Sequence, residues 1–336
     1  MVYWGLFMLP DGMLKGRNMM ETPIFLFTGF LDSGKTLFIK DTLEDEEFRN
    51  DEKILIIACE EGEEEFDEEL LAQWRTRVVY LDSEEELTED FFIECQKNYQ
   101  PDKIILEYNG MWRLEKLFSV KMPKDWVLAQ MITTVNADGF DLYLNNMRSL
   151  VMEQFQETDM VIFNRCDENT KKASYRRSVK AINPKAQVYF ENADGSPSEP
   201  DESLPFDINQ DTIEIEDTDF GVWYVDAMDN PQKYDEKTVK MRVQVYKSLK
   251  MPATSFVPGR FAMTCCVDDI RFIGPLCHAT PTLAPKVKGL KKRQWIYLTA
   301  KVKVEYAALY KGEGPVLYTE KIEPASEPEE KVVYFN

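Results

Sequence analysis

One short segment, "IFLFTGFLDSGKTLF" at residues 24–38, constrains the fold of this chain more than any other. An apolar run ends at Gly29, and Gly34-Lys35-Thr36 follow after four variable residues. This is the spacing of a phosphate-binding loop, which requires a buried strand before it and a helix after it. Its glycines let backbone amides point at a phosphate, while Lys35 would reach the phosphates and Thr36 would ligate Mg²⁺. The segment therefore predicts nucleotide binding on an α/β fold.

An acidic side chain inside this loop opposes the binding of an anion. Asp32 occupies one of the variable positions, where the backbone amide rather than the side chain does the binding. Facing inward, its carboxylate would repel a phosphate at close range. We predict that the side chain points away, lowers the nucleotide affinity, or helps to hold Mg²⁺. The predicted loop residues are Gly29, Asp32, Ser33, Gly34, Lys35 and Thr36.

Buried apolar runs alternate with helical stretches through the first half of the chain. The helical stretches include residues 83–99 and 142–157. Such alternation predicts a mostly parallel sheet with crossover helices, as in P-loop nucleotide-binding domains. The predicted strands lie at residues 24–29, 53–60, 102–110, 126–137, 158–167 and 186–192.

The composition changes at residues 192–211, "NADGSPSEPDESLPFDINQD", which have no apolar period and are typical of a linker. After this segment, short β-like runs separated by turn signals predict a small barrel or sandwich. The predicted organisation is an N-terminal extension at 1–20, a nucleotide-binding domain at 21–193, a linker at 194–217 and a β-domain at 218–336.

A candidate base-reading motif, "FNRCD", stands at the end of the fifth predicted strand. It has the form Asn-Lys-x-Asp with arginine in place of lysine. Asp167 would accept hydrogen bonds from the N1 and N2 hydrogens of guanine, a pairing that adenine does not offer. Asn164 would stabilise the loop and contact the other edge of the purine, and Arg165 would stack on the base. The motif favours guanine over adenine.

Several segments together resemble the CobW family of P-loop GTPases, which is related to the HypB and UreG metallochaperone GTPases. The resemblance covers about residues 22–192. It implies that Glu107 lies near Mg²⁺ or the attacking water and Gly110 by the γ-phosphate, so that Lys35 and Glu107 serve catalysis. The matching segments are "TGFLDSGKT" (28–36), "CEEGEEEFD" (59–67, with Glu60, Gly62, Glu63 and Asp67), "ILEYNG" (105–110), "TTVNADGF" (133–140) and "INPKAQV" (182–188).

The family's Cys-x-Cys-Cys metal motif has no counterpart in this chain, because the corresponding residues 78–92 contain no cysteine. Soft thiolates select Zn²⁺ and similar ions, and carboxylates such as Asp82, Glu84 and Glu85 do not replace that chemistry. Metal transport through the first domain is therefore not expected from the motif itself.

A second candidate metal site lies in the β-domain, at Cys265, Cys266, Cys277 and His278. These residues would bind a transition metal such as Zn²⁺, with Asp268 or Asp269 completing the site. The alternative is that the cysteines are small buried hydrophobic residues. Adjacent residues of a strand face opposite sides, and the spacing fits no established zinc ribbon.

The β-domain resembles the C-terminal domain of a poorly characterised bacterial family over about residues 218–336. Its segments "FVPGRFAMTCCVDDIRFIGPLC", "QWIYLTAKV" and "YKGEGPVLYTEKIEPASEPEEKVVYF" carry the resemblance. Members of that family are soluble subunits paired with permeases. The resemblance implies an OB-like β-barrel and a permease-like membrane partner.

The formal net charge of −20 argues against nucleic acid or an anionic membrane as the main partner. A short basic run, Lys286 to Arg293, is the exception, and a solvated turn would also explain it. Fifteen acidic residues between Asp41 and Glu69 form either a solvated face or an acidic switch region. The six irregularly spaced cysteines favour a reducing cytoplasm, and "MVYWGLFML" is too short to span a bilayer.

These features predict a cytoplasmic, Mg²⁺-dependent GTPase that acts as a nucleotide switch, with a role in metal trafficking and a client metalloprotein as partner. No direct membrane insertion is expected. The alternative from another class is a nucleotide-binding adaptor that does not hydrolyse GTP and regulates a permease-like complex. An ATPase is a third possibility.

Overall fold

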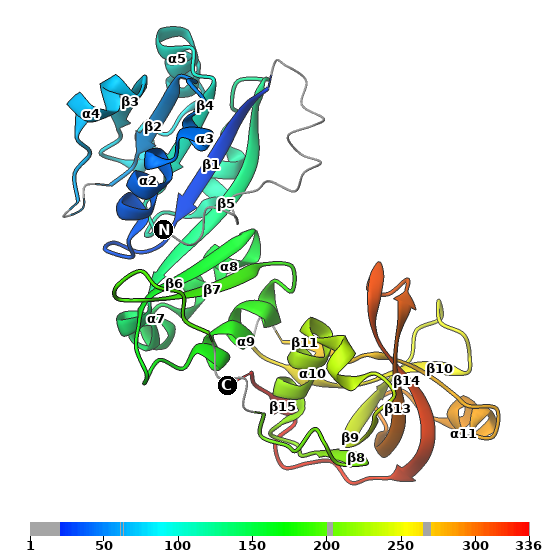
Figure 1. The fold of residues 1–336 in the computed structure, drawn as a ribbon. Helices are drawn as coiled ribbons and strands as arrows, with labels where there is room; N and C mark the ends of the chain where they lie inside the picture. The colour runs from blue at the N-terminus through cyan, green and yellow to red at the C-terminus, as the bar shows by residue number, and fades with distance from the viewer. Residues whose placement is uncertain (1–20, 61, 63, 200–203, 265–269, 336) are drawn as a thin grey trace. The chain divides into compact units, whose positions relative to one another are not determined.

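The computed structural model describes residues 21–336 except 61, 63, 200–203, 265–269 and 336. The chain forms two compact units. Unit 1 comprises the described residues of 1–172 and 185–200, and unit 2 those of 173–184 and 201–336 (Figure 1).

Unit 1 is built on a seven-stranded sheet in which all neighbouring strands run parallel, with the order β3-β2-β4-β1-β5-β6-β7. The central strand β1 is buried along its whole length, as expected where helices cover both faces of a sheet. The α/β prediction is confirmed. The strands are β1 (Thr22–Thr28), β2 (Ile54–Ala58), β3 (Thr76–Tyr80), β4 (Lys103–Glu107), β5 (Trp126–Asn136), β6 (Met160–Cys166) and β7 (Gln187–Asn192).

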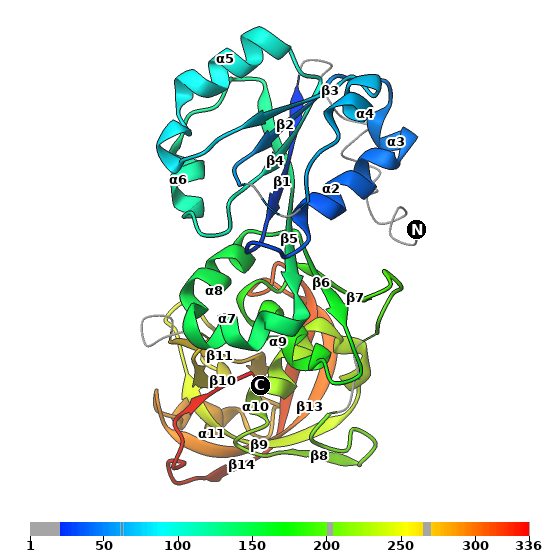
Figure 2. The same cartoon turned by 90° about the vertical axis from the view of Figure 1, so that its left-hand side faces the viewer.

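Helices cover both faces of this sheet, as Figure 2 shows. On one face, α2 (Lys35–Glu44), α3 (Glu46–Arg49) and α4 (Glu68–Gln73) lie over a core that includes Ile39 and Ile56. On the other face, α5 (Glu89–Tyr99) and α6 (Leu114–Ser119) lie over a separate core cluster. The remaining helices of this half of the chain are η1 (Glu84–Glu86), η2 (Ala137–Gly139), α7 (Phe140–Asn146), α8 (Arg148–Gln156) and α9 (Lys172–Ile182).

The strand order places β1 between β4 and β5, because the chain builds β2, β3 and β4 on one side of β1 and then β5, β6 and β7 on the other. In parallel sheets, ligands bind beyond the carboxyl ends of strands at such a switch point. The loop after β1 therefore lies at the edge where β2, β4, β5 and β6 also end. This arrangement brings distant segments of the sequence to one place.

Unit 2 contains a barrel-like sheet, in the order β11-β10-β12-β14-β13-β9-β8. Strand β10 pairs with β9 as well as with β11 and β12, which bends the sheet back on itself. The prediction of a C-terminal all-β domain is confirmed. Its strands are β8 (Thr212–Ile215), β9 (Thr238–Tyr246), β10 (Ser255–Ala262), β11 (Arg271–Ile273), β12 (Leu276–His278), β13 (Trp295–Ala307), β14 (Gly312–Pro324) and β15 (Val332–Val333).

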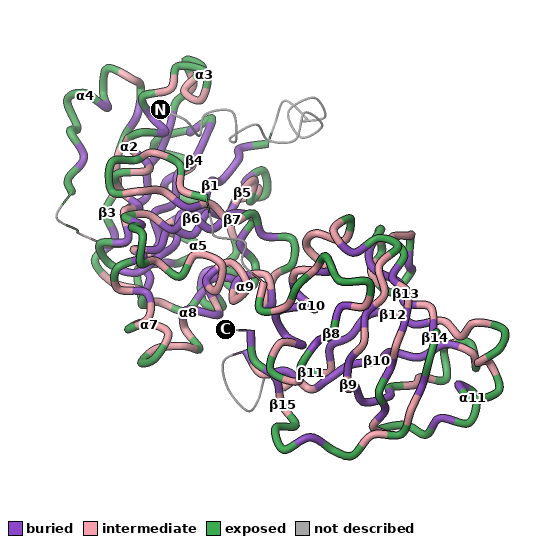
Figure 3. The backbone as a smooth tube through the Cα atoms, turned by 60° about the horizontal axis from the view of Figure 1, so that its bottom comes forward, coloured by how far each residue is buried: buried purple, intermediate pink, exposed green. Residues whose placement is uncertain are grey.

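Alternating burial along β9 and β13 turns one row of side chains into the barrel core (Figure 3). Val239, Val243, Ile296 and Val302 are fully buried there. Besides α9, the helices in the described part of unit 2 are α10 (Phe220–Asp229), η3 (Pro231–Tyr234) and α11 (Ala284–Gly289). Among the described residues, none of the helices combines the length and the apolarity that crossing a bilayer requires.

Candidate nucleotide site

Two glycines allow the loop between β1 and α2 to adopt a backbone conformation with positive φ angles. Gly29 and Gly34 have φ angles of +138° and +91°. A Cβ atom would lie 2.3 Å from the Thr134 carbonyl at Gly29 and 2.6 Å from the Asn164 amide nitrogen at Gly34. The hydroxyl oxygens of Ser33 and Thr134 are 2.8 Å apart. The loop is therefore curled tightly against the ends of β5 and β6.

The Lys35 side chain is folded back over this loop and is only 2 % exposed. Its ammonium donates hydrogen bonds to the carbonyls of Gly29 (2.8 Å) and Phe30 (3.0 Å) and forms an ion pair with Glu60. Glu60 follows β2 and belongs to the segment at 59–67 that carries part of the family resemblance, but it is not among the predicted nucleotide-binding residues. Its position at the carboxyl end of a neighbouring strand is the sequence feature that could have identified it.

Thr36 and Glu107 contact each other at the edge of the loop. The Thr36 hydroxyl donates to a Glu107 carboxylate oxygen at 2.6 Å, and Glu107 is buried at the end of β4. Burial raises the pKa of Glu107, while the bond from Thr36 and the charge of Lys35 lower it and the Glu60 carboxylate raises it further. Two oxygen atoms of the type that Mg²⁺ prefers thus lie side by side, next to the Lys35 ammonium. Gly110 lies against the backbone of Gly29.

The base-reading motif reaches the loop through two of its three side chains. The Asn164 amide nitrogen donates to the Ser33 carbonyl at 2.7 Å, and the Arg165 guanidinium donates to the Asp32 carbonyl at 3.1 Å. The Asn164 side-chain oxygen is buried and has no hydrogen-bond partner among the described residues. The Asp32 side chain is exposed, and its backbone is left-handed, with φ +58°.

Asp167 forms its side-chain hydrogen bonds within its own turn. Its carboxylate accepts from the Asn169 backbone amide and from the Thr170 hydroxyl, each at 2.9 Å. The bonds from Thr170 and Asn169 lower the pKa of this exposed carboxyl. Of the predicted nucleotide residues, the structure brings together the loop, Glu107, Gly110, Asn164 and Arg165, while Asp167 is held at the nearby end of β6.

The cysteine and histidine residues of the β-domain are only partly described. Cys277 is fully buried, which raises the pKa of its thiol, whereas the half-buried His278 ring hydrogen-bonds the Ser255 hydroxyl at 2.8 Å. Cys265 and Cys266 lie outside the described residues. Within the part of the chain that the structure describes, no cluster of three or more His, Cys, Asp or Glu residues has the geometry to hold a metal ion. The four-residue metal site stays a prediction.

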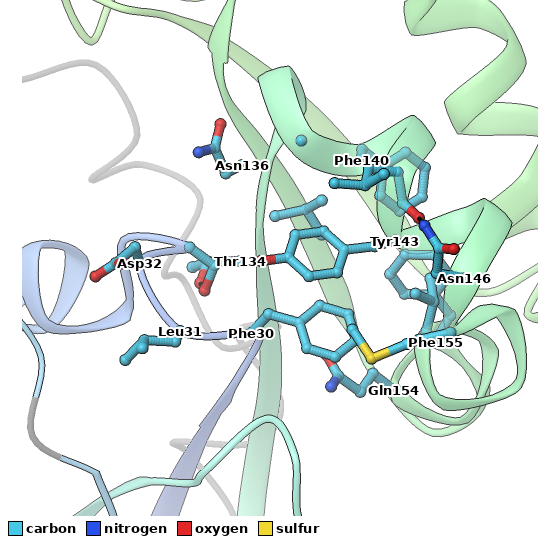
Figure 4. Close-up of a pocket in the computed structure, with 16 residues that line it drawn as sticks. Phe30, Leu31, Asp32, Thr134, Asn136, Phe140, Tyr143, Asn146, Gln154 and Phe155 are labelled. Carbon is cyan, nitrogen blue, oxygen red and sulfur yellow. Dashed lines mark hydrogen bonds between the residues drawn. The ribbon is translucent and has the colours of Figure 1, made fainter.

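A cavity of about 400 Å³ adjoins the outer side of the loop (Figure 4). The Phe30 ring stacks on Tyr143 of α7, with 4.4 Å between the ring centroids. Phe140 and Phe155 contribute further aromatic surface. The cavity wall is mainly apolar, so it is unsuited to phosphate and is distinct from the polar site around Lys35.

Comparison with protein families agrees with this geometry. Residues 23–190, half of the chain, match the family model "CobW/HypB/UreG, nucleotide-binding domain". The chain belongs to this family, which is related to the metallochaperone GTPases. Residues 191–335 match a second model, the DUF1980 C-terminal domain. Among curated proteins, none matches the chain.

Solved structures that resemble the chain include two hydrogenase maturation factors HypB and one YjiA GTPase. HypB from Archaeoglobus fulgidus is 19 % identical, with 52 % of this chain and 84 % of that one covered and a TM-score of 0.37. A zinc-bound triple mutant of YjiA is 18 % identical, with 67 % and 74 % covered and a TM-score of 0.40. HypB from Helicobacter pylori in complex with nickel is 14 % identical, with 55 % and 83 % covered and a TM-score of 0.32.

Proposed function

We propose that this chain is a Mg²⁺-dependent GTPase that acts as a nucleotide switch. The observation that supports this most strongly is the contact between Thr36 and Glu107 beside the buried Lys35 ammonium, at the carboxyl edge of a parallel sheet. A cation and two oxygen ligands at one edge of the sheet suit a Mg²⁺-bound phosphate chain. Family membership adds nucleotide binding as the expected role of this domain.

In this proposal, Lys35 and the loop amides after Gly29 bind the phosphates, and Thr36 and Glu107 hold Mg²⁺. When bound, Mg²⁺ neutralises part of the phosphate charge. The chain itself supplies positioning and charge, because phosphoryl transfer to water needs little covalent help from the protein. Glu107 orients the metal ligands or the attacking water, and Gly110 permits close approach beside Gly29.

Guanine is the base that the end of β6 suits best. Local hydrogen bonds hold the pKa of the exposed Asp167 carboxyl below its usual range, and an ionised carboxylate accepts the two guanine donors. The Asn164 amide donates to the Ser33 carbonyl and so holds the loop, and the choice between the two bases rests on Asp167. Arg165 would stack on the base from the exposed side.

The cellular role we propose is metal trafficking in the cytoplasm, with a client metalloprotein or a permease-like subunit as partner. The related metallochaperone GTPases support the role, and the free, buried thiols of Cys59, Cys95 and Cys166 suit a reducing compartment. Because the cysteine motif is missing, we favour a role in which the bound nucleotide controls the contact with a partner over one in which unit 1 itself carries Zn²⁺. A non-hydrolysing adaptor would use the same contacts.

Steady-state phosphate release from GTP separates the hydrolase from the adaptor. The full chain is compared with Lys35→Ala and Glu107→Ala, with nucleotide binding measured on the same preparations. We expect release by the wild type that falls by about 10²-fold or more in both variants. GTP binding without release above that of the variants would refute hydrolysis and leave the adaptor.

A further inference from the structure

Seven cations and one exposed leucine lie on three segments of unit 2 that contact the end of β9 or continue from it. They come from the connection between β9 and β10, from α11, and from the turn before β13. The seven residues, which together with Leu249 we name the lysine surface, are Lys247, Lys250, Lys286, Lys288, Lys291, Lys292 and Arg293. All except Lys247 are exposed.

Specific contacts bring the two parts of this surface together. The Lys247 ammonium donates to the carbonyls of Val287 (2.5 Å) and Leu290 (3.1 Å), at the end of α11. The Arg293 backbone amide donates to the Val245 carbonyl at 2.8 Å. The Lys292 ammonium lies over the Tyr246 ring, 5.1 Å from its centroid. The surface is therefore a defined arrangement and not a collection of separate side chains.

Among the described residues, no carboxylate neutralises the charges of this surface, although the Lys247 and Lys286 ammonium groups donate to backbone carbonyls. Within the described residues, none of the seven cations forms an ion pair with a carboxylate. Lysines elsewhere on the same barrel do form such pairs: Lys240 with Glu214 at 2.7 Å, Lys301 with Glu236 at 2.5 Å and Lys321 with Glu323 at 2.9 Å. Between Lys237 and Val304 the sequence carries 14 lysines and arginines against two aspartates. An acidic chain thus carries one strongly basic segment.

Leu249 identifies the kind of partner. It is the most exposed large hydrophobic residue of the described structure, with a relative exposure of 106 %, and it lies between Lys247 and Lys250. Cations alone would suit any polyanion, including nucleic acid. An aliphatic side chain extended into water among lysines suits a surface with anionic headgroups outside and acyl chains beneath.

We propose that the lysine surface binds an anionic lipid membrane, with the cations on the headgroups and Leu249 inserted at the boundary of the acyl chains. This is adsorption to one leaflet and requires no spanning helix. The net charge of −20 does not prevent it, because at physiological salt the field of charges more than about 8–10 Å away is screened. The proposal is independent of the nucleotide site.

Co-flotation of the full chain with vesicles tests this proposal. Vesicles of phosphatidylcholine alone are compared with vesicles that also contain phosphatidylglycerol. We expect binding only to the anionic vesicles and its loss in about 1 M NaCl, where the screening length is ~3 Å. The variant Lys288→Gln/Lys291→Gln/Lys292→Gln should bind about a hundredfold more weakly, at about fivefold per cation. Leu249→Ser should bind about tenfold more weakly without a change in charge.

The matched control is Lys240→Gln/Lys301→Gln/Lys321→Gln, which removes the same charge from paired lysines of the same barrel. It should bind as the wild type does. An equal loss in the control would show that net charge alone governs binding and would overturn the proposal. Equal binding to neutral vesicles, wild-type affinity in Leu249→Ser, or binding to polyuridylate without binding to anionic vesicles would overturn it as well.

Discussion

The ion pair between Lys35 and Glu60 predicts an effect opposite to that of most substitutions in a binding site. A nucleotide phosphate and the Glu60 carboxylate compete for the same ammonium, which is 2 % exposed, while the Glu60 side chain is 10 % exposed. A hydrogen bond between charged, buried groups contributes about 1.5–3 kcal/mol. Removing the competing carboxylate by Glu60→Gln should therefore tighten nucleotide binding about 10- to 150-fold.

Calorimetric titration with GDP measures this effect. EDTA is present to remove Mg²⁺, so that any role of Glu60 in Mg²⁺ binding does not change the measured affinity. The control is Glu64→Gln, which removes the neighbouring ion pair between Lys40 and Glu64. The Glu64 side chain is 58 % exposed. An exposed pair contributes at most about 1 kcal/mol, so the control should change the affinity by less than about fivefold. Weaker or unchanged binding by Glu60→Gln would refute the competition.

Three other substitutions test the nucleotide site and, separately, the buried cysteine of unit 2. Asp32→Gly removes a negative charge from the loop at a left-handed position that glycine adopts freely, so calorimetry should show about three- to tenfold tighter GTP binding; unchanged affinity would make Asp32 a bystander. Burial raises the pKa of Glu107 in the folded state. The contribution of this carboxyl to the free energy of unfolding is therefore fully present below its unfolded-state pKa and is lost as the pH rises through its folded-state pKa. Glu107→Gln should therefore raise Tm at pH 7 but not at pH 4, and equal shifts at both would contradict this. Cys277→Ala should lower the stability by about 1–2 kcal/mol without changing zinc uptake, because the thiol is fully buried; reduced zinc stoichiometry would instead support the metal site.

Local patterns in the sequence predicted the parts of the site that depend on backbone conformation. The loop from Gly29 to Thr36 lies between a strand and a helix, as its spacing requires. The contacts that complete the site join residues far apart: Asn164 and Ser33 are separated by 131 positions, and Glu107 and Thr36 by 71. Which side chains meet depends on strand order, and no periodicity in the chain encodes that order.

Among the elements that the sequence analysis did not specify, three were missed for clear physical reasons. Strand β3 lies at the edge of the sheet and has only one buried residue, Thr76, so it lacks the continuous apolar run of the central strands. Strand β8, within the predicted linker 194–217, has only four residues and depends on pairing with β9. Helix α10 is apolar on nearly every side because it is buried in unit 2, with Trp223 fully buried, and it shows no amphipathic period.

Competition between GTP and ATP for the wild-type chain and for Lys35→Ala tests the central claim most directly. The account predicts that GTP binds at one site per chain, that ATP competes at least about tenfold more weakly, and that Lys35→Ala abolishes the binding of both. Equal affinity for ATP would contradict the assignment of Asn164 and Asp167 to guanine. Undiminished GTP binding by Lys35→Ala would contradict the phosphate site itself.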